Sequence, residues 1–95
     1  MVFGKVAGTV VCSSRNDGME GPRYLLIDKT NQYGERKGEF VVALDIVGAG
    51  PDELVLLTEG SPSRETPVTV NKPLDALVVA IVDQVDEHEQ VIYRK

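Results

Sequence analysis

The sequence has 95 residues, of which 42% are hydrophobic and 26% are charged, with a formal net charge of −5. This length and composition predict one soluble globular domain over residues 1–95. The acidic balance argues against a protein that follows nucleic-acid phosphates, because such binders need clustered lysine and arginine. No apolar run approaches the roughly 20 residues that span a bilayer, and the start lacks a signal-peptide pattern, so we expect an intracellular protein without a membrane partner.

Two strands are predicted in the first part of the chain. Residues 2–14 are rich in β-branched side chains and contain Gly4 and Gly8, which predicts a long strand bent or bulged at a glycine. After a loop marked by Asn-Asp-Gly and Gly-Pro, residues 23–30 (RYLLIDKT) predict a second strand. The polar residues 31–38 are expected to form a hairpin connection exposed to water.

A glycine loop follows between two apolar strands, predicted over residues 40–46 and 53–58. The loop reads Gly48-Ala49-Gly50-Pro51. Glycine allows backbone conformations and close approaches that a Cβ would prevent, and proline fixes φ and removes a donor. A turn this constrained predicts that its backbone closely approaches a phosphate, a substrate or another protein chain.

The last third of the chain contains one ambiguous segment. Apolar residues within residues 74–85 recur at helical spacing, but most of them are β-branched and therefore favour a strand. We predict a short helical turn over residues 73–77, then a strand to about Val85. A charged turn over residues 86–89 and a closing strand over residues 90–94 complete the chain.

About six short strands with glycine-rich turns, and at most one short helix, predict an all-β sandwich or barrel. Closure into a barrel would remove the exposed strand edges that otherwise promote aggregation.

No motif indicates phosphate or dinucleotide binding. The opening Gly48-Ala49-Gly50 resembles a dinucleotide fingerprint, but Glu53 occupies the third glycine position and begins a strand instead of a helix. No helix N-terminus is therefore predicted to hold a pyrophosphate.

Catalytic and metal-binding residues are also too few. A metal site needs three or four ligands, whereas the chain has one histidine, His88, and one cysteine, Cys12. A single cysteine also excludes a disulfide within the chain. Ser61 and Ser63 lack the elbow sequence of a nucleophilic serine. We expect that the protein is not an enzyme and that it binds no metal and no cofactor.

Single-stranded nucleic-acid binding by a small barrel is the alternative function. Such a module needs stacking aromatics and a basic groove. Lys5, Lys29, Arg36 and Lys37 could form a basic patch, but the chain has only two Phe and three Tyr, and its total charge is unfavourable.

Three blocks of the sequence resemble the vertex proteins of bacterial microcompartments, the EutN/CcmL family of carboxysome and ethanolamine-utilisation shells. The blocks are GTVVCSSRNDG, VVALDIVGAGPDELVLLTEGSPSR and KPLDALVVAIVDQV, and their order and spacing cover nearly the whole chain. One segment departs from the family: its usual Gly-Ser-Ser-Ala-Arg is here Gly60-Ser61-Pro62-Ser63-Arg64.

The resemblance implies a small five-stranded barrel related to the OB-fold, with an extra short strand or hairpin. It also implies a non-enzymatic structural protein whose copies form a homopentamer, with a ring of six as the alternative. Such pentamers cap the five-fold corners of a microcompartment shell in the bacterial cytoplasm, next to hexameric shell proteins that form the facets.

Within that ring we expect two functional segments. Gly48, Ala49 and Gly50 are predicted to approach the symmetry axis and frame a narrow pore, with a tight internal turn as the alternative explanation. Arg64 is the predicted polar contact between subunits, since its planar fork suits bidentate pairing, with Asp45 and Glu65 as candidate partners. The other predicted interface residues are Gly60, Ser61 and Ser63.

Overall fold

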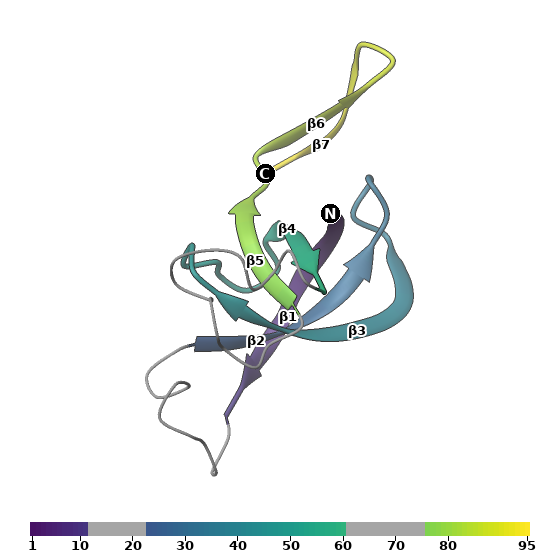
Figure 1. Ribbon diagram of the computed structural model, residues 1–95. Coiled ribbons are helices and arrows are strands. Elements are labelled where there is room, and N and C mark those ends of the chain that lie inside the picture. The colour runs from purple at the N-terminus through teal and green to yellow at the C-terminus, as the bar shows by residue number, and fades with distance from the viewer. Residues whose placement is uncertain (12–22, 61–75) are drawn as a thin grey trace.

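A computed structural model describes residues 1–11, 23–60 and 76–95 of the chain (Figure 1). These residues form seven strands: β1 (Val2–Val10), β2 (Arg23–Thr30), β3 (Arg36–Asp45), β4 (Leu54–Glu59), β5 (Ala76–Ile81), β6 (Gln84–Glu87) and β7 (Gln90–Arg94).

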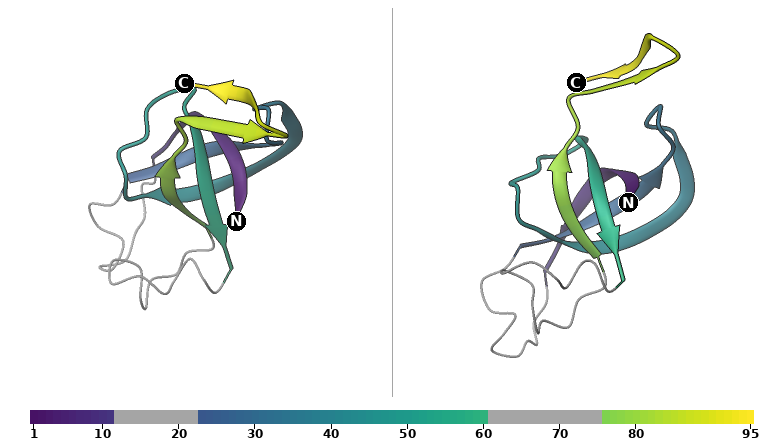
Figure 2. Two further views of the ribbon diagram at one scale, coloured as in Figure 1. Left: turned by 90° about the horizontal axis from the view of Figure 1, so that it is seen from above. Right: turned by 45° about the horizontal axis from the view of Figure 1, so that its top comes forward.

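Five of these strands close into a barrel in the order β1-β2-β3-β5-β4, and β6 pairs with β7 in a separate two-stranded sheet (Figures 1 and 2). All neighbouring barrel strands run antiparallel except β3 and β5, which are parallel. The prediction of a small all-β, five-stranded OB-like barrel with an added hairpin is confirmed.

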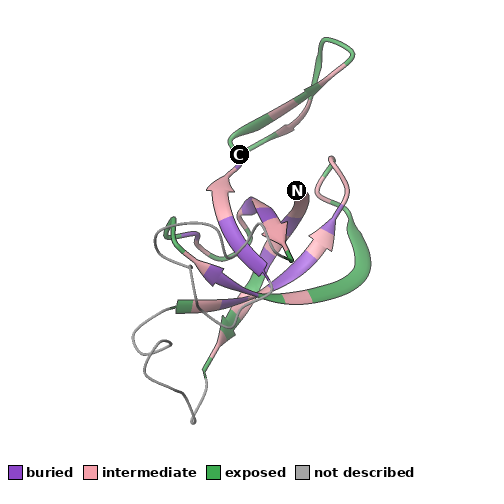
Figure 3. Ribbon diagram, viewed as in Figure 1, coloured by how far each residue is buried: buried purple, intermediate pink, exposed green. Residues whose placement is uncertain are grey.

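The barrel encloses one hydrophobic core because alternate strand residues point inward. On β2, for example, the side chains of Leu25 and Ile27 are fully buried, whereas those of Tyr24 and Leu26 are only partly covered (Figure 3). The main cluster of buried core residues consists of Val6, Leu25, Ile27, Ala43, Ala49, Val55, Leu57, Ala76 and Val78.

The predicted irregularity of the first strand is confirmed at a glycine. The pairing of β1 with β2 shifts register between Val6 and Gly8. Gly4 has a different role, because a Cβ added there would lie 2.4 Å from Cγ2 of Ile27. The strands can therefore pack across the barrel at this point only if residue 4 has no side chain.

The connection between β2 and β3 is shorter than predicted, since β3 begins at Arg36. Asn31 closes it: its side-chain oxygen accepts hydrogen bonds from the backbone N–H groups of Tyr33 (2.9 Å) and Glu35 (3.0 Å). The backbone of Asn31 also donates to the carbonyl of Glu35 at 3.0 Å. A side chain that reproduces backbone turn contacts in this way lets the strand start early.

The predicted helical turn over residues 73–77 is wrong where it can be compared. Residues 73–75 lie outside the described part of the chain, and Ala76 and Leu77 belong to β5. They pair with Glu59 and Thr58 of β4, and Leu77 also pairs with Leu44 of β3. Pairing on both sides overrides the helical spacing of the apolar residues.

The strand predicted to reach Val85 instead ends at Ile81, and a new strand begins at Gln84. The backbone N–H of Val82 still donates to Leu54 of β4 at 2.8 Å, but the carbonyl of Asp83 accepts from Lys95 at 2.9 Å. At this point the chain exchanges β4 for its own last strand as partner. The predicted turn over residues 86–89 correspondingly shortens, because Asp86 and Glu87 belong to β6.

Candidate functional site

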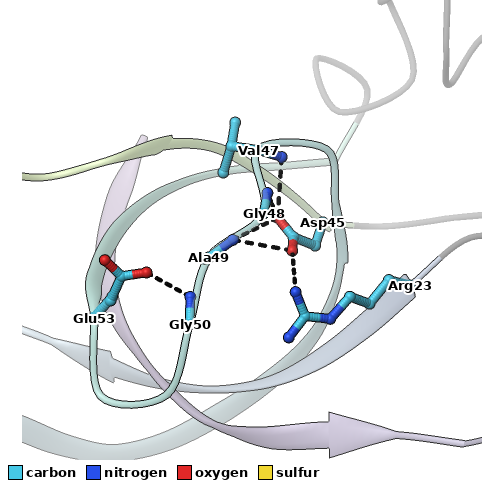
Figure 4. A network of polar contacts seen from close by, with 7 residues as sticks. All are labelled: Arg23, Asp45, Val47, Gly48, Ala49, Gly50 and Glu53. Carbon is cyan, nitrogen blue, oxygen red and sulfur yellow. Dashed lines mark hydrogen bonds and ion pairs between the residues drawn. The ribbon is translucent and has the colours of Figure 1, made fainter.

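The carboxylate of Asp45, at the end of β3, organises the glycine loop (Figure 4). It accepts backbone hydrogen bonds from Val47 and Gly48, both at 3.1 Å, and from Ala49 at 3.1 Å and 3.4 Å. It also forms an ion pair with Arg23 at 3.2 Å, and its side chain is only 1% exposed. A short acidic side chain that accepts several backbone N–H groups fixes the path of a turn.

The loop residues differ in their surroundings. Ala49 is fully buried and is part of the barrel core, whereas Gly48 is exposed and has a φ of 75°. Positive φ favours glycine at this position because a Cβ would be strained. The loop therefore inserts a small apolar side chain into the barrel and presents bare backbone to the outside.

Glu53 holds the far side of the loop. Its carboxylate accepts a hydrogen bond from the backbone N–H of Gly50 and forms an ion pair with Lys95 at 2.8 Å. The Lys95 ammonium, followed by the Gly50 amide, holds the pKa of Glu53 below its usual value, and Glu53 raises the pKa of Lys95. Glu53 thus connects the glycine loop to the end of β7.

A second contact holds the C-terminal hairpin, β6–β7, at its tip. Glu87 of β6 accepts hydrogen bonds from the Tyr33 hydroxyl at 2.6 Å and from the Gln32 amide at 2.9 Å, both in the β2–β3 turn. The Tyr33 hydrogen bond is the main cause that lowers the pKa of Glu87, and the same bond raises the pKa of Tyr33. The hairpin extends beyond the barrel (Figures 1 and 2) and is fixed to it at both ends.

Acid is expected to release the hairpin tip. Because folding lowers the pKa of Glu87, its stabilising contribution is complete above the ordinary glutamate pKa of about 4.3 and is lost as the pH falls through the lower folded value. The contribution of Tyr33, whose pKa is raised, is lost only when strongly alkaline pH passes through that raised value. Amide-exchange protection factors of the hairpin, corrected for intrinsic rates, should fall several-fold from pH 6 to pH 3.

The variant Tyr33→Phe provides the control for this acid release. It removes the hydroxyl that binds Glu87, so hairpin protection should be lower at pH 6 and should decrease less on acidification. Equal protection in both proteins at both pH values would contradict a role for this contact.

The hairpin turn is strained. His88 and Glu89 both have positive φ, at 52° and 66°, a combination that type I′ turns require and that favours Asn-Gly. The double variant His88→Asn/Glu89→Gly should stabilise the hairpin by about 1 kcal/mol, measured as increased amide protection. His88→Ala still requires a non-glycine residue with positive φ, so it should not stabilise the hairpin. Equal stabilisation by both variants would refute the explanation that positive φ strains this turn.

Metal ligands, a membrane-spanning helix and free basic groups were each sought among the described residues. No group of three or more His, Cys, Asp or Glu within residues 1–11, 23–60 and 76–95 could hold a metal ion. No helix in this part of the chain is long and apolar enough to cross a membrane.

Of the cations considered for a nucleic-acid patch, Lys29 pairs with Glu59 at 3.1 Å and Arg36 with Asp28 at 3.3 Å, which reduces their positive field.

The structure brings together only some of the predicted site residues. Asp45 directly contacts the predicted pore loop, and Gly60 is exposed at the end of β4 with a φ of 70°. Ser61, Ser63, Arg64 and Glu65 lie outside the described residues. The pore and interface roles therefore stay predictions.

Sequence reasoning missed two contacts that define this region. It did not identify Arg23 as the partner of Asp45, although the two residues face each other across the β2–β3 ladder. It also missed the contact of Glu87 with Tyr33, which joins residues 54 positions apart. Neither contact has a local signal, since each depends on a strand register or on the path of a hairpin.

Comparison with known proteins gives a consistent result. The family model for "Ethanolamine utilisation protein EutN/carboxysome" matches residues 1–83. The carboxysome shell vertex protein CcmL of Synechococcus elongatus is 37% identical over 95 residues, which cover 100% of this chain and 96% of that protein.

Solved structures agree with this match. The structure of Gloeobacter violaceus CcmL superposes with a TM-score of 0.94 at 38% identity and covers 100% of this chain and 98% of that one. GrpN, a pentameric microcompartment shell protein from Rhodospirillum rubrum, has a TM-score of 0.83 at 37% identity and covers 92% of this chain and 99% of that one. The chain belongs to the EutN/CcmL family, as the three sequence blocks had indicated.

Proposed function

We propose that this protein is a structural subunit of a bacterial microcompartment shell. Five copies form a closed ring, and the ring caps a five-fold vertex of the shell in the bacterial cytoplasm. Hexameric shell proteins that form the facets are its neighbours in this arrangement. The protein contributes shape and closure to the shell, and no catalysis.

The observation that carries this proposal is the match over the whole chain to a carboxysome shell vertex protein at 37% identity. The similarity to pentameric GrpN supports a ring of five over a ring of six. The fold supports it in a second way, because the described residues form a closed barrel in which the polar contacts of Asp45 and Tyr33 fix a loop and a hairpin.

Within the ring, we propose that the exposed backbone at Gly48 lies closest to the symmetry axis. The loop is held rigidly by Asp45, and at Gly48 it carries no side chain that would collide with its symmetry copies. We further propose Gly60, Ser61, Ser63 and Arg64 as contacts between subunits, with Glu65 as a partner. Because Asp45 already binds Arg23 and three backbone amides, its part in the interface is to hold the loop in place.

Coassembly with facet proteins tests the proposed function. A hexameric shell protein is expressed with and without this chain, and the particles are examined by electron microscopy. With the chain present, closed polyhedra should form and the chain should copurify with them. Particles that close equally well without the chain, or that never contain it, would contradict the proposal.

A further inference from the structure

Two different side chains hold the two parts of the glycine loop. Asp45 accepts the backbone amides of residues 47–49 and so fixes the first part. In the second part, the Gly50 amide donates to the carboxylate of Glu53, and the Gly50 carbonyl accepts from the Glu53 amide at 3.3 Å (Figure 4). The path of Gly50-Pro51 therefore depends on the position of the Glu53 side chain.

The backbone of Glu53 is fixed by β1, whereas its side chain is fixed by the C-terminal hairpin. The Val6 amide donates to the Glu53 carbonyl at 3.1 Å, and the Val6 carbonyl accepts from the Asp52 amide at 2.9 Å. On the side chain, Oε1 accepts from Gly50 and Oε2 pairs with Lys95 at 2.8 Å. Each partner holds one oxygen, so the two contacts together set the orientation of the carboxylate. A glutamate that loses one of them regains rotamer freedom.

Lys95 moves with the β6–β7 hairpin, because its amide donates to the carbonyl of Asp83 at the start of the hairpin at 2.9 Å. None of residues 83–95 is buried, and the hairpin extends beyond the barrel (Figures 1 and 2). A two-stranded sheet without buried side chains is marginally stable, and such elements open at a low cost in free energy. The contacts at its two ends, Tyr33 with Glu87 and Lys95 with Glu53, therefore matter for its position.

We propose that the hairpin controls the conformation of the glycine loop through Glu53, which acts as a positioning residue. While the hairpin lies against the barrel, Lys95 and Gly50 hold the Glu53 carboxylate between them. When the hairpin is drawn away, Lys95 leaves with it, the 20% exposed Glu53 side chain turns toward water, and the Gly50 amide loses its acceptor. The contacts of Asp45 do not involve the hairpin, so the change is confined to Gly50-Pro51.

The coupling is a property of one subunit and does not require a ring. Its consequence for the shell rests on the proposed function, in which the glycine loop lies near the symmetry axis. In that ring, a molecule that binds the hairpin and draws it away from the barrel would loosen the backbone of Gly50-Pro51 at the axis.

Amide exchange of the full chain, followed by nuclear magnetic resonance at pH 6, tests the coupling. Lys95→Met removes the ammonium and keeps a long side chain. Exchange of the Gly50 amide should become about two- to fivefold faster, the range expected for an exposed ion pair. The Ala49 amide, which Asp45 holds, should exchange as before. Lys37→Met neutralises an exposed lysine of β3 and is the matched control, which should change neither amide.

A change at the far end of the hairpin tests the transmission. Tyr33→Phe removes the tip contact and should accelerate Gly50 exchange about twofold in the otherwise unmodified chain. In the Lys95→Met background it should add nothing, because the link to Glu53 is already broken. Unchanged Gly50 exchange in Lys95→Met would overturn the inference. Equal effects of Tyr33→Phe in both backgrounds, or equal acceleration of Ala49, would also overturn it.

The failure of this coupling differs from the failure of the proposed function. Variants are compared in the same state of assembly, which sedimentation establishes, and the Gly50 amide reports the coupling in a ring and in a single subunit alike. A chain that never associates would remove the proposed function and leave the coupling to stand or fall on Gly50 exchange.

Discussion

Replacing Gly4 by valine is expected to reduce the free energy of unfolding by about 3 kcal/mol or more, because the barrel has no room for a side chain there. Even a single Cβ would lie 2.4 Å from Cγ2 of Ile27 and 3.2 Å from the backbone carbonyl oxygen of Asp28. Ile27 is fully buried and branched at Cβ, so it cannot rotate away without disturbing its neighbours. Urea denaturation followed by circular dichroism measures the loss.

Gly8 on the same strand provides the matched control. A Cβ at Gly8 would meet nothing within 4 Å, and its backbone does not have positive φ. Gly8→Ala should therefore leave the protein as stable as before or stabilise it by about 0.5 kcal/mol, through reduced freedom of the unfolded chain. If Gly4→Val were no more destabilising than Gly8→Ala, the close packing of β1 against β2 would be refuted.

The second large effect is expected at Asp45. The side chain of Asp45 is only 1% exposed. Asp45→Ala removes the acceptor for three backbone amides and also the ion-pair partner of Arg23. Water can reach Val47 and Gly48, but Ala49 is buried, so its amide would lose its acceptor away from solvent. We expect a loss of about 2 to 3 kcal/mol in the free energy of unfolding.

Two further variants make this result specific. Glu39→Ala removes an exposed carboxylate from the same strand, 4.0 Å from Lys29, and should cost less than about 0.5 kcal/mol. Asp45→Asn keeps one acceptor oxygen, so its loss in the free energy of unfolding should lie between those of Asp45→Ala and Glu39→Ala. Equal losses for Asp45→Ala and Glu39→Ala would show that the loop does not depend on Asp45.

The strands and the family were predictable because their signals are local. Alternation places Leu25 and Ile27 inside the barrel, and Gly48 and Gly50 mark the loop. The break after Ile81 was not predictable, because it reflects a change of partner from β4 to β7. Asp83 and Gln84 interrupt the apolar residues here, but two polar residues do not by themselves indicate an exchange of strand partners.

The apolar character of β3 is visible in the sequence. Residues 40–44 (FVVAL) are apolar at every position, which is typical of a strand covered on both faces. The partner of Asp45 could not be found from the sequence, since the pairing of Arg23 with Asp45 follows from the β2–β3 register.

Native mass spectrometry of the unmodified protein at micromolar concentration tests the central claim most directly. A closed ring predicts one dominant species at five times the 10.3 kDa mass of the chain, with no ladder of longer oligomers. A single subunit at every concentration, or an open series of oligomers without a preferred number, would contradict the assignment of this protein to a shell vertex.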